Sequence, residues 1–327
     1  MIRVKMTTCF PEWPLERQTP GKSGKWGECI YLINKPVPEC DWWVVYEDLI
    51  SPETAACPAG HTMLITAEPP SLKKYDPAFL NQFGMVITCH PNLDHPNVIL
   101  MQQALPWHIG RRTKGHANLG FGLEYDQLRS LPPPPKTKCM SVICSGKAVT
   151  KGHRARLAFI QRLVEHFKEQ LDAFGRGVKD IEDKWIALAD YRYHIVLENS
   201  SVRHYWTEKL ADAFLGWTYP IYFGCPNLGD YFPAEAFLSI DIEDPHTSIQ
   251  KIEQTVARQT YERKQHQISQ SRSLVLDRYN LFAILAVHCS AESTRAYETV
   301  NLQPQASFLH KRSVFKRVCA KVARWGF

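Results

Sequence analysis

The sequence predicts an α/β protein made of two domains, each built around a mainly parallel sheet. Its first third contains short apolar runs separated by turn residues, a pattern typical of buried parallel strands. These runs are residues 42–46, 63–66, 85–89 and 98–101. Four consecutive prolines at 132–135 cannot continue a helix or a central strand, and a second series of strand and helix patterns follows them. A chain of 327 residues with 44% hydrophobic content can form two such cores.

The proline run gives the expected division of the chain. The predicted parts are an N-terminal domain at 1–131, a linker at 132–136, a second domain at 137–310 and a basic tail at 311–327. Residues 76–83 fit a short helix between two strands of the first domain. In the second domain, strands are predicted at 139–144, 193–198, 220–223 and 237–240, helices at 155–174, 207–217 and 246–276, and another apolar segment at 284–289.

Cysteine usage and hydropathy predict a cytoplasmic protein. The ten cysteines form no C-x-x-C pair and no zinc-ligand spacing, so free thiols in a reducing compartment are expected. No run of about 18 apolar residues occurs that could cross a membrane, and the first residues lack the apolar core of a signal peptide. The net charge of +6 is concentrated in the tail, so nucleic acid is not an expected partner of the rest.

The segment Tyr191–Lys209, YRYHIVLENSSVRHYWTEK, is the most informative part of the chain. An apolar strand-like run ends at Glu198, a polar turn follows, and Thr207 opens an amphipathic helix. A strand–loop–helix unit of this kind suits a phosphorylated ligand, because a helix N-terminus offers unpaired N–H groups and the positive end of a dipole. Lys209 adds a formal positive charge in the first turn of that helix.

This segment resembles the donor-site signature of the α1,3/4-fucosyltransferases, glycosyltransferase family 10: a Y-x-F/Y-x-x-x-x-E-N-S strand followed by Y-x-T-E-K. Residues 219–227 resemble the family's P-hydrophobic-hydrophobic-G-x-P turn, residues 231–241 its F-x-P…F-I-x-V-x-D segment, and Lys184 begins its K-x-x-x-L-x-x-Y run. The resemblance covers roughly residues 142–244. It implies a GT-B architecture, with two Rossmann-like domains facing a cleft and the donor bound by the C-terminal one.

The resemblance also implies a reaction. L-Fucose would move from GDP-β-L-fucose to a sugar hydroxyl with inversion, which needs a carboxylate base for the acceptor and cations for the departing pyrophosphate. GDP-fucose is then the donor substrate, a bacterial surface glycan or its lipid-linked precursor is the expected acceptor, and neither a metal nor another cofactor is required. Two alternatives stay open: a transferase for another GDP-sugar, and a non-catalytic protein of GT-B fold that binds a nucleotide sugar.

For the base, the sequence favours Glu68. It ends the apolar run 63–67 and precedes two prolines, which would stiffen the turn that carries it. The resembled family has a glutamate after an apolar strand of its N-terminal domain, and Glu68 is similar to it in context. Glu47 and Asp48, which follow the run 42–46, are the rival acids.

For the departing pyrophosphate, the resemblance implies Lys209 and Arg156. An arginine can hold pyrophosphate oxygens with two hydrogen bonds, whereas a lysine acts as a point charge; Arg154 is two residues from Arg156 and could be confused with it. Glu208 is expected to accept hydrogen bonds from ribose hydroxyls. The full set of expected donor-binding residues is Arg156, Glu198, Asn199, Ser200, Tyr205, Thr207, Glu208 and Lys209. Glu198 could instead orient the loop, and Ser200 and Ser201 could instead satisfy turn or capping hydrogen bonds.

Aromatic side chains of the first domain are candidates for the acceptor, because aromatic faces stack on sugar rings. Trp43, Trp107 and His108 are the predicted contacts, with core packing as the alternative for each. No metal site is expected. The acidic turn at 241–244 and the pair His90 and His95 are only weak candidates for one.

The basic tail predicts an amphipathic helix. Its apolar residues recur at spacings of three and four: Phe315, Val318, Val322 and Trp325. Its basic residues are Lys311, Arg312, Lys316, Arg317, Lys321 and Arg324. A helix of this kind can lie on an anionic bilayer, which would make the enzyme a peripheral membrane protein. The alternative is that it docks on the protein's own N-terminal domain.

Overall fold

The computed structural model describes residues 1–104, 106–114, 117–144, 151–175, 178–289 and 296–309. They fall into two compact units, each an α/β unit with a mainly parallel sheet, as predicted. The first unit contains Met1–Leu15, Gly24–Gln103 and the described residues from Leu285 onward. The second contains Glu16–Ser23 and Ala104–Ile284.

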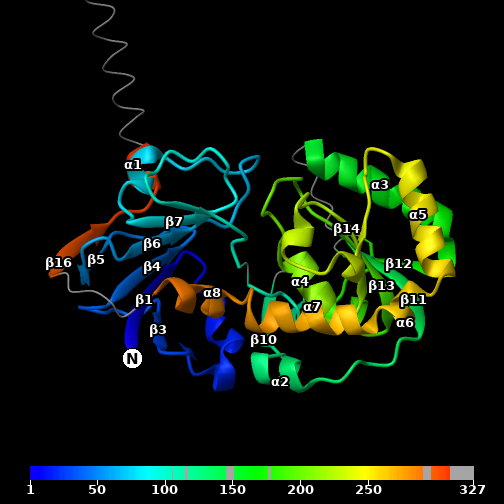
Figure 1. The fold of residues 1–327 in the computed structure, drawn as a ribbon, viewed down its shortest axis with the longest axis horizontal. Helices are drawn as coiled ribbons and strands as arrows, with labels where there is room; N and C mark the ends of the chain where they lie inside the picture. The colour runs from blue at the N-terminus through cyan, green and yellow to red at the C-terminus, as the bar shows by residue number, and fades with distance from the viewer. Residues whose placement is uncertain (105, 115–116, 145–150, 176–177, 290–295, 310–327) are drawn as a thin grey trace, which may run out of the picture. The chain divides into compact units, whose positions relative to one another are not determined.

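The first unit is built on a seven-stranded sheet of order β2-β3-β1-β4-β6-β7-β8 (Figure 1). Only the β2–β3 pair is antiparallel. The strands are β1 (Ile2–Thr8), β2 (Lys25–Trp26), β3 (Cys29–Ile33), β4 (Trp42–Tyr46), β6 (Thr62–Ile65), β7 (Met85–Thr88) and β8 (Val98–Leu100). A separate antiparallel pair joins β5 (Glu53–Pro58) to β16 (Tyr297–Leu302), and α1 (Pro77–Leu80) precedes β7.

One face of this sheet carries the core of the first unit. Trp43 and Val45 of β4 are fully buried and share a cluster with Cys57 of β5, Phe79 of α1 and Leu302 of β16. The β5–β16 pair and α1 therefore cover this face. Because β1 pairs in register with β4, the odd-numbered residues of β1 point to the same side as Trp43 and Val45.

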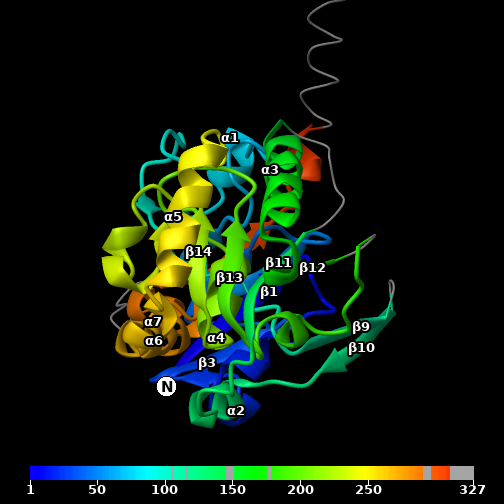
Figure 2. The same ribbon diagram turned by 90° about the vertical axis from the view of Figure 1, so that its right-hand side faces the viewer.

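The second unit is built on a five-stranded parallel sheet of order β12-β11-β13-β14-β15 (Figure 2). Its strands are β11 (Lys138–Ile143), β12 (Leu171–Phe174), β13 (Tyr191–Leu197), β14 (Tyr219–Phe223) and β15 (Leu238–Ser239). Its helices are α2 (Tyr125–Ser130), α3 (Lys151–Phe167), α4 (Glu208–Leu215), α5 (Pro245–Ala257), α6 (Thr260–Arg263) and α7 (Gln265–Asp277). A small antiparallel pair, β9 (Arg111–Lys114) and β10 (Ala117–Phe121), precedes α2, and α8 (Leu281–His288) leads the chain back into the first unit.

Helices cover both faces of the second sheet. Phe159 of α3 and Ile252 of α5 share a buried cluster with Ile195 of β13, so α3 and α5 lie on one face (Figure 2). The helix α4 packs against β13, β14 and α7. Because side chains alternate along a strand, His194 and Val196 point away from the α3–α5 face, toward α4.

Two helix predictions differ from the structure. The helix expected at 155–174 ends at Phe167, where Lys168 takes a left-handed conformation (φ +47°), and residues 171–174 form β12. The long helix expected at 246–276 is three helices, interrupted where Gln259 has φ +50°. The apolar segment at 284–289, for which no element type was predicted, lies mostly in α8. The apolar residues keep a helical spacing across the breaks at Lys168 and Gln259, so the sequence pattern did not reveal either break.

The chain divides elsewhere than at the proline run. The prolines lie inside the second unit, between α2 and β11, and the chain passes between units near residues 15–16, 23–24, 103–104 and 284–285. The Lys136 ammonium donates to the carbonyl oxygens of Leu188 (2.9 Å) and Gly216 (2.7 Å), which ties the segment to this unit. A run of prolines cannot form a helix, but such a segment can still pack against a domain instead of linking two domains.

The amphipathic helix predicted for residues 311–327 lies outside the described residues. Its two alternatives, a membrane surface or the protein's own N-terminal domain, therefore stay predictions. Among the helices of the described ranges, none is both long and apolar enough to cross a bilayer.

Candidate functional site

A charged cavity of about 320 Å³ lies in the second unit, where β11 and β13 end and α4 begins. Its lining residues are His108, Ile143, Arg156, Lys184, Leu188, His194, Ile195, Val196, Leu197, Glu208, Lys209 and Asp212. Three of them are cations and two are carboxylates. Ligands of open α/β sheets bind at the carboxyl ends of the strands, and this volume lies within the range of about 300–1,000 Å³ found for small-molecule sites.

Glu198 fixes the start of α4 against the end of β13. Its buried carboxylate accepts hydrogen bonds from the Thr207 backbone N–H (2.8 Å) and from the Thr207 hydroxyl (2.8–2.9 Å). Thr207 is also the N-cap of α4, since its hydroxyl oxygen accepts from the Lys209 N–H at 3.3 Å. The Lys209 ammonium lies 3.3 Å from Glu198. These contacts hold the ammonium at the helix N-terminus, and they give Glu198 the orienting role that the sequence left open.

Gly224 explains the glycine in the P-I-Y-F-G-C-P turn. Its φ is +156°, and a Cβ at this position would lie 2.5 Å from Cγ of Glu198 and 2.6 Å from the Tyr222 hydroxyl oxygen. A larger residue would therefore displace the carboxylate that positions Lys209.

The charges around Lys209 stabilise each other. Burial opposes the ammonium, but the Glu198 and Glu208 carboxylates outweigh it and raise the pKa of Lys209 above its usual value. Burial likewise disfavours the Glu208 carboxylate, but Lys209 at 3.5 Å and Lys184 at 3.7 Å help to hold the pKa of Glu208 well below its usual range. Both groups are therefore charged at neutral pH, with Glu208 able to accept hydrogen bonds.

Arg156 supplies the second predicted cation. Its side chain is buried, and its guanidinium donates to the Asn199 side-chain oxygen, which follows β13. Burial lowers the pKa of Arg156, with Glu198 opposing it, and a guanidinium stays charged in proteins. Arg154, the residue that could be confused with it, is exposed on α3 and is not among the lining residues.

The other predicted donor residues lie on the loop between β13 and α4. Asn199 and Ser200 are half-buried and Tyr205 is buried. The Ser201 hydroxyl donates to the Gly224 carbonyl oxygen at 2.9 Å, which is the turn-stabilising role considered for it. None of these contacts identifies a ligand, so the donor roles of Asn199, Ser200 and Tyr205 stay predictions.

Asp212 and Lys184 line the cavity with roles that the sequence did not reveal. One Asp212 oxygen accepts from the backbone N–H groups of His108 and Ile109, both at 3.0 Å, and the other accepts from the Lys184 ammonium at 2.7 Å. Asp212 thus holds the 108–109 backbone to α4 and fixes a third cation 3.7 Å from Glu208. An acid inside the apolar run L-A-D-A-F-L was the one available signal.

Two histidines line the same cavity in the neutral form. Burial lowers the pKa of His108 to about 3, although Glu208 opposes the effect. Burial also lowers the pKa of His194 to about 3, and its Nδ1 is 2.7 Å from the Ser141 hydroxyl. Neutral imidazoles can exchange hydrogen bonds with a ligand without adding charge.

Replacing Asp212 with asparagine should lower the free energy of unfolding by about 1–3 kcal/mol, the usual loss when a hydrogen-bonded charged group loses its partner. The amide oxygen can still accept from the backbone, but Lys184 loses its closest carboxylate. Denaturant unfolding measures the change. Glu262→Gln is the control, because its ion pair with Arg192 is at the surface, where pairs contribute about 0–1 kcal/mol. Equal losses in the two variants would exclude the proposed role of Asp212.

The predicted acceptor contacts need correction. Trp43 is fully buried, and its indole N–H donates to the Thr7 hydroxyl at 3.1 Å. Trp107 is only 2% exposed. With their rings covered, both tryptophans are core residues, the alternative considered from the sequence. His108 belongs to the second unit and lines the charged cavity beside Glu208, at 3.9 Å.

In the first unit, Glu68 lies on a loop that is fixed on both sides. It is exposed and follows β6. The preceding Ala67 N–H donates to Glu47 at 2.5 Å, and the Glu68 carbonyl oxygen accepts from Nε2 of His90 at 2.9 Å. A carbonyl oxygen only accepts, so His90 carries its proton on Nε2; burial also lowers the pKa of His90. The loop therefore presents the Glu68 side chain from a backbone of fixed position.

The rival acids are engaged in structural contacts. The Glu47 carboxylate is buried and accepts from Ala67, from the Tyr75 hydroxyl (2.8 Å) and from Lys73. Asp48 accepts from the backbone N–H groups of Leu49 (2.8 Å) and Gln305 (3.0 Å). Glu47 and Asp48 thus both have structural roles at the end of β4.

The weak metal candidates do not assemble into a site in the described part of the chain, where no group of three or more potential metal-ligating side chains occurs. Nε2 of His90 donates a hydrogen bond to the Glu68 carbonyl oxygen, and Nε2 of His95 lies 2.8 Å from the Phe83 carbonyl oxygen. Asp241 accepts from the Glu243 N–H, and Asp244 caps α5.

The second unit is thus an α/β domain with a cationic cavity at the carboxyl edge of its sheet, as in nucleotide-binding domains. Residues 133–267 match the family model described as "Glycosyltransferase family 10 (fucosyltransferase) C-term". This match covers less than half of the chain.

The chain is also similar to individual proteins, in sequence or in structure. The alpha-(1,3)-fucosyltransferase FucT of Helicobacter pylori is 31% identical over 61 residues, which is 19% of this chain and 13% of the relative's length. A crystal structure of an α1,3-fucosyltransferase with GDP has 15% identity and a TM-score of 0.49, covering 86% of this chain and 93% of the other. One with GDP-fucose has 14% identity and a TM-score of 0.48, covering 90% and 92%.

Proposed function

We propose that this protein is an inverting fucosyltransferase that uses GDP-β-L-fucose and a glycan acceptor. The family match over residues 133–267 supports a glycosyl-transfer reaction, and the Helicobacter pylori relative, matched over 61 residues, is an alpha-(1,3)-fucosyltransferase. Arg156 and Lys209 would stabilise the pyrophosphate, and Glu208 would accept hydrogen bonds from ribose hydroxyls. Glu68 would take the acceptor proton as the hydroxyl oxygen bonds to fucose C1 and the bond from C1 to the GDP oxygen breaks.

One observation carries the proposal: the fixed ammonium of Lys209 at the N-terminus of α4, with Arg156 lining the same cavity. Oriented N–H groups and two cations suit a group that gains negative charge as it leaves. Because the cations are preorganised by Glu198 and Asn199, they need little rearrangement during the reaction.

The test is to offer GDP-fucose, GDP-mannose and GDP to the purified protein and to measure thermal shift, donor hydrolysis and transfer to a panel of glycans. Selective binding and turnover of GDP-fucose are expected. Turnover of another GDP-sugar alone would support the second candidate from the sequence. Binding without any turnover would favour the non-catalytic alternative.

The affinity for GDP-fucose should hardly change between about pH 5 and 9 through His108, His194, Glu208 or Lys209, because none of these four groups titrates in that window. The pKa values of His108 and His194 are lowered to about 3 by burial, that of Glu208 is below its usual range and that of Lys209 is above its own. A nucleotide sugar also lacks a terminal phosphate that could titrate. Calorimetric titration across this range measures the dissociation constant. Because burial raises the pKa of Asp212, the Asp212→Asn variant is titrated as well, and an inflection near pH 6–7 that persists in it would show that a cavity histidine becomes charged.

We also propose a glycan or glycolipid as the acceptor. Contact with an anionic membrane through residues 311–327 is a separate prediction, which co-sedimentation of the full chain with anionic vesicles would test. It predicts binding at low salt that deletion of these residues abolishes while the rest stays folded.

A further inference from the structure

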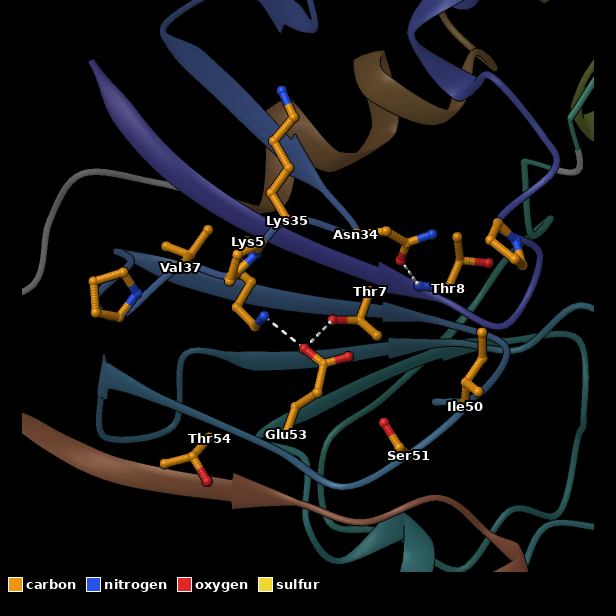
Figure 3. Close-up of a pocket in the computed structure, with 13 residues that line it drawn as sticks. Lys5, Thr7, Thr8, Asn34, Lys35, Val37, Ile50, Ser51, Glu53 and Thr54 are labelled. Carbon is orange, nitrogen blue, oxygen red and sulfur yellow. Dashed lines mark hydrogen bonds and ion pairs between the residues drawn. The ribbon is translucent and has the colours of Figure 1, made fainter.

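The first unit contains a second cavity, of about 710 Å³, that the proposed function does not use (Figure 3). It lies beside the carboxyl-terminal half of β1 and the start of β5. All of its lining residues belong to the first unit. Its volume is within the range of about 300–1,000 Å³ in which small-molecule sites fall.

Two polar residues interrupt an otherwise apolar face at this cavity. Along β1, Val4 and Met6 point to one side, and Lys5 and Thr7 point to the other. Lys5 pairs in register with Trp43, which is part of the hydrophobic core on that side. Removing an ammonium from water is costly, and polar groups at core-facing positions are typical of functional sites.

Glu53 partners these two residues across the cavity. Its Oε2 is 2.6 Å from the Lys5 ammonium and accepts from the Thr7 hydroxyl at 3.2 Å, as Figure 3 shows. The Lys5 side chain is 4% exposed, whereas that of Glu53 is 30% exposed. Among the described residues, both hydrogen bonds to Glu53 end on Oε2, so Oε1 can accept hydrogen bonds from a ligand.

The remaining lining combines apolar and hydroxyl groups. Ile50 is 65% exposed at the rim, and Val37 and neighbouring prolines add further apolar surface. Ser51 contributes a hydroxyl close to Glu53 in sequence and in Figure 3. The Lys35 side chain points away from the Lys5–Glu53 pair in the same view. The Lys5–Glu53 pair is neutral overall, so it does not attract a strongly charged ligand.

We propose that this cavity binds a neutral, hydroxyl-rich ligand, namely a segment of an oligosaccharide. Sugar hydroxyls would donate to Oε1 of Glu53, and the C–H faces of the ring would pack on Ile50 and Val37. The charge on the acceptor strengthens such hydrogen bonds. Binding here would not depend on which nucleotide sugar the second unit takes.

The test is direct binding of neutral trisaccharides, maltotriose and tri-N-acetylchitotriose, to the full chain by ligand-observed NMR with and without GDP. Glu53→Gln should weaken binding by at least about tenfold, as expected when a hydrogen bond to a charged group is lost. Ser51→Trp should do the same by filling the mouth of the cavity while the Lys5–Glu53 pair stays intact. Glu298→Gln is the matched control, because Glu298 is exposed on β16 of the same unit.

Three results would overturn the proposal. The first is that neither trisaccharide binds the wild-type chain at millimolar concentration. The second is that binding survives Ser51→Trp in a variant that unfolds like the wild type. The third is that GDP displaces the trisaccharide or that Lys209→Ala abolishes its binding, which would place it in the charged cavity. Failure of GDP-fucose turnover with trisaccharide binding intact would concern only the proposed function.

Discussion

Replacing Lys209 with alanine is expected to raise the KM for GDP-fucose and to lower kcat, with a loss of about 2–4 kcal/mol of transition-state stabilisation. The ammonium is the cation fixed at the N-terminus of α4, where the leaving pyrophosphate would gain charge. The contact would strengthen as that charge develops, so kcat should fall together with kcat/KM. Steady-state kinetics and the dissociation constant of GDP measure the two parts of the effect.

The controls separate chemistry from folding. Lys209→Ala leaves the buried Glu198 carboxylate with Thr207 as a partner but without its cation, so the free energy of unfolding must be measured as well. Lys138→Ala makes the same change at an exposed ion pair on β11 and should leave GDP binding unaltered. If Lys209→Ala folds normally and its kinetics match the wild type, Lys209 has no part in the donor site.

Much of the fold follows from the sequence, and the misses have local causes. The apolar runs at 42–46, 63–66 and 85–89 correspond closely to β4, β6 and β7, because strands buried on both faces need no polar alternation. The N-terminal strand β1 was missed because Lys5 and Thr7 break its apolar pattern. The pairing of β5 with β16 joins segments about 240 residues apart, which no local pattern reveals.

The candidate site was predictable where its residues are adjacent in the sequence. Glu198, Thr207 and Lys209 belong to one strand–loop–helix unit, and the structure joins them by hydrogen bonds. Asp212 and Lys184 were missed because they are 28 residues apart in the sequence and form their ion pair only in the folded chain. Trp43 was wrongly predicted to contact the acceptor. It is a core residue, and a sequence does not show which aromatic rings are covered.

The change of Glu68 to glutamine should retain GDP binding and remove transfer. An amide is nearly isosteric with the carboxylate but cannot take the acceptor proton, and removal of a general base typically lowers the rate by about 10²–10⁴-fold. The fold should survive, because Glu68 is exposed and the contacts that fix its loop come from the backbone of Ala67 and from its own carbonyl oxygen. Single-turnover transfer and GDP titration measure the two effects independently.

The rival acids provide the comparison that decides the assignment. Glu47→Gln should lower the free energy of unfolding, because the buried carboxylate accepts from Ala67, Tyr75 and Lys73. Any loss of turnover in that variant would then come with a loss of stability, whereas Glu68→Gln should lose turnover at unchanged stability. If Glu68→Gln turns over within about threefold of the wild type, far less than a missing base costs, then Glu68 is not the base. Asp48→Asn, at an acid held by two backbone N–H groups, would then be the next variant to measure.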